Sequence, residues 1–269
     1  MPKKEKTAGR AGIMNTFLTV PHERGRDGKM KKVKLGKKDA VYLIIIGVLV
    51  ISLLVSIFLP IIVKKAKNKD YYESKCESYA VQNTNLSRGQ IIFIGDSITD
   101  LYPLDDYYAD LPLASYNRGI GGDTTSGVLK RLDVSAIDLA PSKIVLMIGT
   151  NDVNGTDSVS EIADRYGEIL DRLEAALPNT EIICMSVIPQ NEVLEEYTDI
   201  DVAKSTERIH ALNSKIAEMT NARAILYLDL YSRLADENDR LIRTYSDDGI
   251  HLNAKGFEVW TELLKPYLT

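Results

Sequence analysis

The stretch IIFIGDSIT at residues 91–99 joins an apolar run to a serine. A short run of Ile and Phe that ends at glycine is typical of a strand buried on both faces, as in a parallel sheet. Ser97 follows this run at the carboxyl end, the edge where open α/β sheets bind their ligands. The stretch therefore predicts an α/β fold with a serine at its ligand-binding edge.

More short apolar runs follow along the chain, and apolar residues recur at helical spacing between them. The expected strands are 91–95, 114–118, 144–148, 182–187 and 224–228, and a last amphipathic helix is expected over 254–264. Alternation of strands with amphipathic helices predicts a central parallel sheet with helices on both faces, a three-layer α/β/α domain.

Ser97 is by itself a weak signal, because a serine after a glycine is more often a turn or helix-cap residue. The α/β-hydrolase pattern G-x-S-x-G is also missing, since Thr99 stands where its final glycine belongs. A nucleophilic serine needs a base. His251 lies in DDGIHLN (247–253) just before the last helix, whereas His210 lies on an amphipathic helix and is expected to be a surface or packing residue.

Asp248 precedes His251 by three residues, with a glycine between them. It can therefore accept the Nδ1 proton of the imidazole and leave Nε2 facing Ser97. Two alternatives stay open at this point. Asp248 can instead cap the last helix, and Asp247 is close enough to take its role.

Two further loops follow the second and third expected strands, NRGIGGDTT at 117–125 and GTND at 149–152. The glycines let the backbone approach a ligand, and Asp123 or Thr124 can cap the next helix. The first loop is no dinucleotide-binding motif, because Thr124 replaces its third glycine. Each loop alone is more often a plain turn. At successive strand ends, however, their N–H groups and the Asn151 amide predict donors for a developing oxyanion.

The segments GDSIT, NRGIGGDTT, GTND and DGIHLN, in this order and spacing, resemble the four sequence blocks of the SGNH/GDSL hydrolase superfamily. The resemblance covers the chain from about residue 90 to its end and implies a flavodoxin-like fold. Ile98 stands where the family nickname has Leu, which leaves the chemistry unchanged. Neither a metal nor an organic cofactor is implied, and no metal-ligand pattern appears in the sequence.

The same resemblance assigns roles to individual residues. The catalytic residues would be Ser97 as nucleophile, His251 as general base and Asp248 as the group that orients it. The oxyanion hole would consist of the Ser97 amide, the Gly122 amide and the Asn151 side chain. The acidic residues of these blocks would support the site: Asp96, Asp123 and Asp152.

Residues 40–63 contain no charged side chain over 24 positions. As a helix this run would be about 36 Å long, enough to span a hydrocarbon core of roughly 30 Å with some tilt. Twelve Lys or Arg residues precede it, which favours a cytoplasmic N-terminus, although four lysines at 64–69 make the other flank basic as well. A cleaved signal peptide is the alternative. The run is long, starts far into the chain and precedes no small-x-small site, so we expect an uncleaved anchor in the cell membrane.

Charge is divided sharply along the chain. Residues 70–269 carry 17 basic and 34 acidic side chains, a formal net charge of about −17. Such a domain would repel phosphate backbones, so nucleic acid is not expected as a partner. The expected organisation is a basic disordered tail at 1–39, a transmembrane helix at 40–63, a polar connector at 64–88 and an extracytoplasmic hydrolase domain at 89–269.

The chain has two cysteines. Cys184 lies in an expected strand, where a thiol usually packs as a small hydrophobic group, and Cys76 lies in the polar connector. A disulfide between them is possible in an oxidising compartment, although a buried strand position seldom faces such a stretch.

The resemblance is closest to the branch of small-acyl esterases and implies cleavage of a carboxylic ester through an acyl-enzyme. An outward-facing, anchored enzyme would meet cell-envelope glycans, so we expect removal of a small acyl group, above all acetyl, from a glycan. Lysophospholipids or other lipid esters are the first alternative. A non-catalytic glycan- or lipid-binding module on the same fold is another, and acyl transfer to a sugar would use the same residues.

Overall fold

The computed structural model describes residues 36–192 and 200–269, apart from the side chain of Asn68. The chain divides into two compact units, 1–65 and 66–269, which are described separately. Most of the basic tail expected at 1–39 lies outside the described residues. Helix α1 (Lys37–Asn83) contributes to both units. Its apolar part is long and hydrophobic enough to cross a membrane, with a mean hydropathy of 3.0 over the best window, and its large side chains are exposed.

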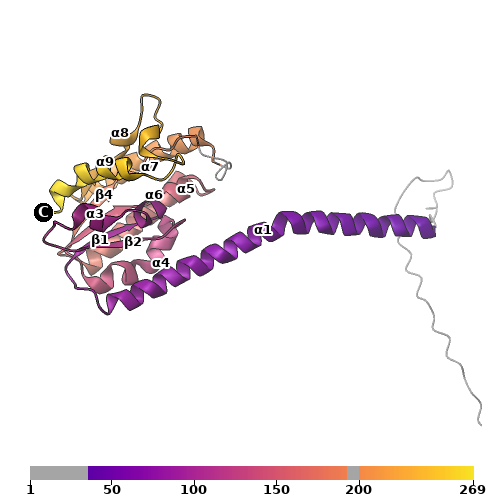
Figure 1. The fold of residues 1–269 in the computed structure, drawn as a ribbon, viewed down its shortest axis with the longest axis horizontal. Coiled ribbons are helices and arrows are strands. Elements are labelled where there is room, and N and C mark those ends of the chain that lie inside the picture. Colours follow the sequence, from indigo (N-terminus) through magenta and orange to yellow (C-terminus); the bar gives the residue numbers. More distant parts are fainter. Residues whose placement is uncertain (1–35, 193–199) are drawn as a thin grey trace, which may run out of the picture. The chain divides into compact units, whose positions relative to one another are not determined.

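The second unit is built on a five-stranded parallel sheet with the strand order β2-β1-β3-β4-β5 (Figure 1). From β1 the chain first adds β2 at one edge of the sheet. It then returns past β1 and adds β3, β4 and β5 in turn towards the other edge. The carboxyl ends of all five strands therefore lie along one edge of the sheet. The strands are β1 (Ile91–Gly95), β2 (Ser115–Gly119), β3 (Lys143–Met147), β4 (Glu181–Met185) and β5 (Leu226–Leu228).

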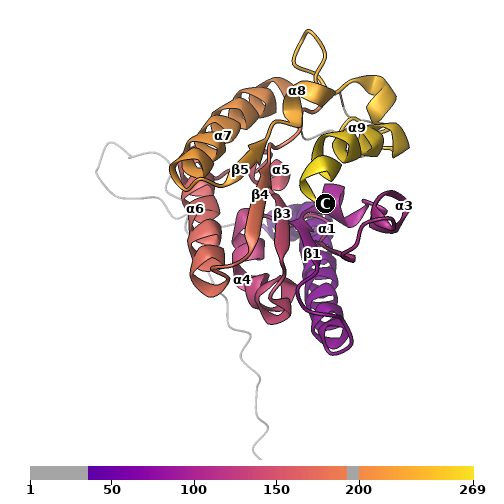
Figure 2. The same cartoon turned by 90° about the vertical axis from the view of Figure 1, so that its left-hand side faces the viewer.

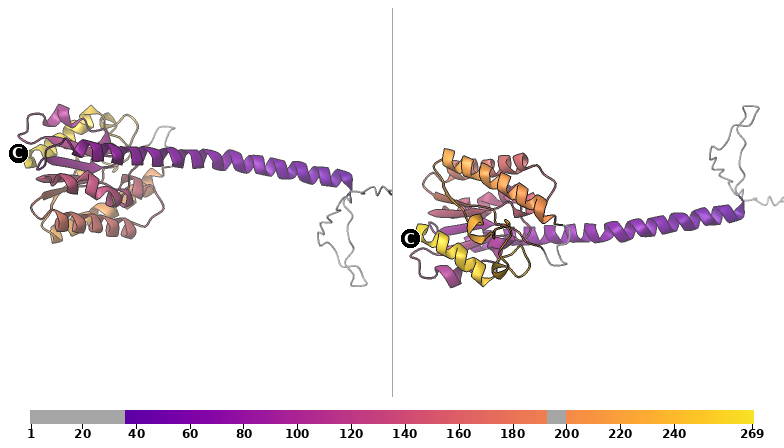
Figure 3. Two further views of the ribbon diagram at one scale, coloured as in Figure 1. Left: turned by 90° about the horizontal axis from the view of Figure 1, so that it is seen from below. Right: turned by 90° about the horizontal axis from the view of Figure 1, so that it is seen from above.

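Helices cover both faces of this sheet, as Figures 2 and 3 show. One layer contains α4 (Thr125–Ser135), α6 (Val159–Ala176) and α7 (Val202–Ala222), and the other contains α3 (Leu104–Tyr108) and α9 (Ala254–Leu264). The remaining helical segments are short: α2 (Ser97–Asp100), η1 (Ile137–Leu139), α5 (Thr150–Val153), α8 (Tyr231–Leu234), η3 (Arg243–Tyr245) and η4 (Lys265–Tyr267). The predicted three-layer α/β/α architecture is confirmed.

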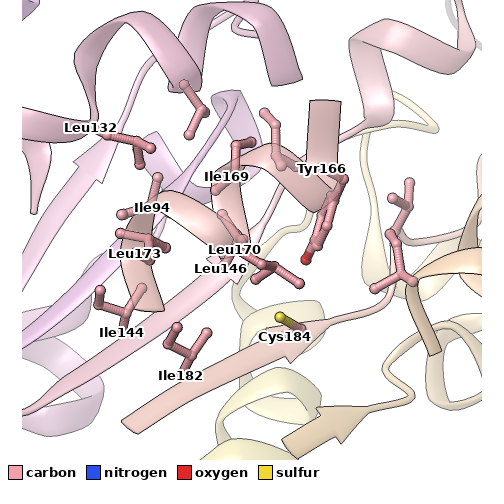
Figure 4. Packing of buried hydrophobic residues seen from close by; sticks show 14 of the residues in the cluster. Ile94, Leu132, Ile144, Leu146, Tyr166, Ile169, Leu170, Leu173, Ile182 and Cys184 are labelled. Carbon is pink, nitrogen blue, oxygen red and sulfur yellow. The ribbon is translucent and has the colours of Figure 1, made fainter. Parts of the chain in front are cut away.

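Two hydrophobic cores separate the layers, because successive strand residues point to opposite faces. Ile92 and Ile94 of β1 pack under α4, α6 and α7, whereas Ile91 and Phe93 pack under α9 together with the fully buried Trp260. Figure 4 shows the first core, in which side chains of α6 interlock with those of β1, β3 and β4. Burial on both faces explains why the strands read as continuous apolar runs.

The observed boundaries of the five strands agree with the expected ones to within two residues. The strand expected at 224–228 begins only at Leu226. Ala224 has φ +55°, and the amide of Ile225 bonds to the carbonyl of Thr220. This left-handed residue and the bond over five residues form the C-terminal cap of α7, so the first two residues of the expected strand end a helix instead.

The stretch expected as a polar connector, 64–88, is helical up to Asn83. Within the second unit its side chains contact the sheet domain, and Tyr79 is buried. Tyr72, Cys76, Tyr79 and Asn83 follow one another at spacings of three or four, the period of a helix face. This periodic face, together with its tyrosines, is the sequence signal that indicates a docked helix.

Candidate active site

Ser97 is the first residue of α2, directly after β1. The side chain of Asp96 caps this short helix by accepting the amide of Ile98 at 3.0 Å. A Cβ atom on Gly95 would lie 2.0 Å from the Thr99 hydroxyl and 2.5 Å from a carbonyl of β3, so only glycine fits there. The sharp turn from strand to helix therefore holds the Ser97 hydroxyl at the carboxyl edge of the sheet.

His251 reaches Ser97 from a loop 154 residues further along the chain. Its Nε2 lies 2.8 Å from Ser97 Oγ, and its Nδ1 lies 2.6 Å from Asp248 Oδ2. The other carboxylate oxygen of Asp248 accepts the amides of Ile250 and His251 at 2.9 and 2.8 Å. Burial raises the pKa of Asp248, but the bonds from the His251 ring and these amides outweigh it and hold the pKa below its ordinary value.

The geometry distinguishes between the alternatives for the two acids of this loop. Asp247 accepts a bond from the Asn253 amide at 3.2 Å, so it faces the start of α9 and not the imidazole. Asn253, not Asp248, is the N-cap of α9. Gly249, which lies between Asp248 and His251, has φ +86°, and a Cβ atom there would lie 2.7 Å from the carbonyl of Glu192. A glycine is thus required where the loop turns the Asp248 carboxylate towards His251.

The loop after β2 lies against the end of β1 and the end of α2. The amide of Ile120 donates to the carbonyl of Gly95, and the amide of Gly121 donates to Asp100 Oδ2 at 3.2 Å. Gly122 has φ +76°, a conformation that glycine adopts without strain. Asn151, in α5 at the end of β3, donates its side-chain amide to the carbonyl of Asp123 at 2.8 Å. The two expected donor loops are therefore in direct contact.

The three supporting acids are all buried. Burial raises the pKa of Asp96 to about 7, against the opposing bonds from Ile98 and Thr150. Asp152 accepts the amide and the hydroxyl of Thr125 at 2.9 and 2.6 Å and thereby ties α5 to the start of α4. Asp123 pairs with Arg131, and its burial raises its pKa although the guanidinium opposes this.

Arg131 is a buried residue of this region that the sequence analysis did not single out. Its guanidinium donates to Asp123 Oδ2 at 2.7 Å, to the carbonyl of Arg118 at 2.7 Å and to the carbonyl of Gly95 at 2.9 Å. It therefore connects the ends of β1 and β2 to Asp123 in the loop after β2. A basic residue at the same helical face as Val128 and Leu132, within a strongly acidic domain, is the signal that could have identified it.

The other histidine that the structure describes and the two cysteines lie outside this arrangement. His210 is half exposed on α7 and lies 3.2 Å from the hydroxyl of Tyr231. Cys76 and Cys184 are both free, and burial raises the pKa of the Cys184 thiol to about 12. In the part of the chain that the structure describes, no group of three or more His, Cys, Asp or Glu side chains could hold a metal ion.

Comparison with known proteins places these residues in a family. The GDSL-like lipase/acylhydrolase family model matches residues 93–259, which include every block quoted above. The alpha2 subunit of platelet-activating factor acetylhydrolase IB from Rattus norvegicus is 33% identical over 105 residues, which are 38% of this chain and 45% of that protein. The chain thus spans less than half the length of this curated relative.

Solved structures agree with the fold. A Streptococcus pneumonia protein described as a platelet activating factor is 30% identical, with a TM-score of 0.72 over 78% of this chain and 99% of that one. A GDSL-like lipase from Bacteroides thetaiotaomicron has a TM-score of 0.65 at 24% identity, over 72% of this chain and 96% of that one. The chain belongs to the GDSL-like lipase/acylhydrolase family.

Proposed function

We propose that this chain is a membrane-anchored, extracytoplasmic esterase that removes a small acyl group, above all acetyl, from a glycan, with Ser97 as its nucleophile. One observation carries the catalytic part of the proposal. The hydrogen-bonded series Ser97 Oγ, His251 Nε2, His251 Nδ1 and Asp248 Oδ2 has distances of 2.8 and 2.6 Å. A hydroxyl, an imidazole and a carboxylate in this order form the arrangement that activates serine for acyl transfer.

In the proposed mechanism Ser97 Oγ attacks the acyl carbon while His251 Nε2 takes its proton. The negative charge then moves to the carbonyl oxygen, where the amides of Ser97 and Gly122 and the side chain of Asn151 would stabilise it. Collapse of this intermediate releases the alcohol, which His251 protonates, and leaves Ser97 acylated. Water, deprotonated by His251, then attacks the acyl-enzyme, and His251 returns this proton to Ser97 Oγ as the acid leaves. Asp248 keeps the imidazole oriented in each step.

Two observations support a small acyl group on a polar carrier. The curated relative that matches part of the chain is named as an acetylhydrolase. Ser97, Asp248 and His251 are all partly exposed. A partly open site suits the hydroxyl-rich alcohol of a sugar ester.

A lipid ester is the second candidate, because the same relative is named for platelet-activating factor. The apolar segment of α1 would keep such an enzyme next to lipid. The candidates differ in the alcohol that leaves, not in the residues that act.

The apolar segment supports an anchor, and the excess of basic residues before it supports a cytoplasmic N-terminus. The family domain would then lie outside the cell membrane. Protease added to sealed, right-side-out vesicles should digest the domain that begins after α1 and spare the tail. Digestion only after detergent treatment would overturn this topology.

The activity is tested with the full chain in detergent micelles. Aryl esters of acetate should be cleaved more than about tenfold faster than octanoate esters, because a pocket for acetyl rejects a long chain. Acetate should be released from an acetylated oligosaccharide faster than fatty acid from a lysophospholipid. Ser97→Ala should abolish both reactions. Preference for the lysophospholipid would favour the lipid candidate, and persistence of activity in Ser97→Ala would remove the proposed mechanism.

Acyl transfer and simple binding are separated in the same assay. A sugar acceptor that gains acetyl at the expense of free acetate would identify a transferase. Binding of glycan without any ester cleavage would identify a non-catalytic module.

A further inference from the structure

The part of α1 inside the second unit, Ala66–Asn83, meets the end of α2 at a single carboxylate. Lys75 Nζ lies 2.6 Å from Asp100 Oδ1, and the hydroxyl of Tyr71 donates to Asp100 Oδ2 at 2.6 Å. Asp100 is the last residue of the short helix that begins at Ser97. Two side chains of α1 therefore hold a group one helical turn away from the nucleophile.

The same carboxylate also holds the loop after β2, which contains Gly121 and Gly122. Asp100 Oδ2, which accepts the Tyr71 hydroxyl, also accepts the amide of Gly121 at 3.2 Å. A Cβ atom on Gly121 would lie 3.6 Å from the Tyr71 ring, so the ring lies beside this glycine. Gly121 precedes Gly122, whose amide is a proposed donor to the oxyanion. Because Gly122 has φ +76° and glycine has broad conformational freedom, fixing the preceding residue restricts the direction of that amide.

Other contacts hold this part of α1 without involving Asp100. The hydroxyl of Tyr72 donates to the carbonyl of Gly127 in α4 at 2.7 Å, and the hydroxyl of Tyr79 donates to the carbonyl of Gly119 at the end of β2. Asn83 donates to the carbonyl of Val134 at 2.8 Å. These bonds dock the helix on the sheet domain, whereas Tyr71 and Lys75 bind Asp100, which in turn binds the loop that carries Gly122.

We propose that Tyr71 and Lys75 are positioning residues that act through Asp100 to keep the Gly121–Gly122 segment ready to stabilise the oxyanion. The inference rests on the proposed function, since it gives Gly122 its role there. Catalysis gains most from donors that are already oriented when charge develops, so a loosened Gly122 amide should reduce the rate of the chemical step more than substrate binding. The helix that contains the apolar segment would thus also help to orient the Gly122 amide.

The test measures kcat and KM for an aryl acetate with the full chain in detergent micelles. Tyr71→Phe and Lys75→Met should each lower kcat by about tenfold and leave KM within about twofold, since a donor is disordered and not removed. Lys75→Arg keeps a positive charge beside Asp100 and should retain most of kcat. Tyr72→Phe is the matched control, because it removes one hydroxyl from the same helix. It should lower the melting temperature about as much as Tyr71→Phe and leave kcat within about twofold.

A double-mutant cycle tests the route through Asp100. In the Asp100→Ala background, Tyr71→Phe should lower kcat no further, because the group through which it acts is gone. If Asp100→Ala does not fold, Asp100→Asn takes its place in the cycle. Additive effects would overturn the proposed route, and so would a loss of kcat in Tyr72→Phe equal to that in Tyr71→Phe.

Failure of this inference differs from failure of the proposed function. If Ser97→Ala abolishes hydrolysis but Tyr71→Phe and Lys75→Met retain full kcat, only the positioning role is wrong. If the unaltered chain cleaves no ester, or Ser97→Ala still does, the proposed mechanism fails and the positioning role fails with it.

Discussion

His251 Nε2 lies 2.8 Å from Ser97 Oγ although 154 residues separate them in the chain. Ser97 is delivered by the end of β1, and His251 by the loop that precedes α9. β1 ends at the carboxyl edge of the parallel sheet, and after β5, α8 and η3 the chain brings the loop with His251 back to Ser97 there.

Asp248 should be far more important for turnover than its neighbour. Asp248→Ala removes the acceptor of the His251 Nδ1 proton, and we expect kcat to fall by about 10² or more, since the imidazole loses its orientation. Asp247→Ala is the matched control, because that carboxylate contacts Asn253. Steady-state kinetics on an aryl acetate should show the control within about threefold of the unaltered chain. Equal losses in the two variants would contradict the pairing.

Asn151→Ala should lower kcat by about 10² to 10³ with little change in KM, the pattern of a donor that acts in the transition state. The Asn151 amide lies beside the loop after β2, where it donates to the carbonyl of Asp123. Stopped assays that separate kcat from KM check this. A rise in KM at constant kcat would instead indicate that Asn151 binds the ground state of the substrate.

Arg131→Met should destabilise the second unit by about 3 to 5 kcal/mol, because it leaves the Asp123 carboxylate buried without its partner. The side chains of this pair are only 1% and 2% exposed. Arg243→Met removes an exposed pair with Glu192 and should cost less than about 1 kcal/mol. The chain has a single tryptophan, the buried Trp260, so its fluorescence reports unfolding of this unit. Equal stability losses would contradict the structural role of Arg131.

Asp96 should make stability depend on pH. Burial raises its pKa to about 7 in the folded chain, from 3.8 as an ordinary value, so the folded state holds this proton more tightly than the unfolded state. Its stabilising contribution is therefore present at low pH and is lost as pH rises towards and through about 7. Between pH 5 and pH 8 the unaltered chain should lose about 3 kcal/mol relative to Asp96→Asn.

The measurement for Asp96 is urea unfolding, followed by Trp260 fluorescence, of both chains at several pH values. Titrating groups that do not interact with Asp96 affect both chains alike and cancel in the comparison. Parallel pH profiles for Asp96→Asn and the unaltered chain would show that Asp96 is ionised in the folded state at pH 5.

Much of the fold could be predicted because buried parallel strands and amphipathic helices leave strong periodic signals. α9, for example, was predicted with its observed bounds, 254–264. The start of β5 could not be predicted, since the left-handed Ala224 depends on how α7 ends and alanine gives no warning of that conformation. Propensity describes a residue's usual conformation and not the one that its tertiary context imposes.

The residues of the candidate site could be selected because few alternatives exist. Within 70–269 the chain has only two histidines, and only His251 lies in a loop at the expected edge. Arg131 and the docked part of α1 were missed for a physical reason. Their importance depends on contacts with carbonyls and carboxylates far away in sequence, as between Arg131 and Gly95 or Tyr71 and Asp100. No local pattern encodes such partners.

Covalent labelling tests the central claim most directly. The full chain in detergent is treated with a fluorophosphonate, which phosphonylates an activated serine, and the adduct is located by peptide mass spectrometry. We expect one adduct on the peptide that contains Ser97, with loss of esterase activity in proportion to labelling and no adduct in Ser97→Ala. An adduct on a different residue, or an unlabelled chain that still cleaves esters, would contradict the account.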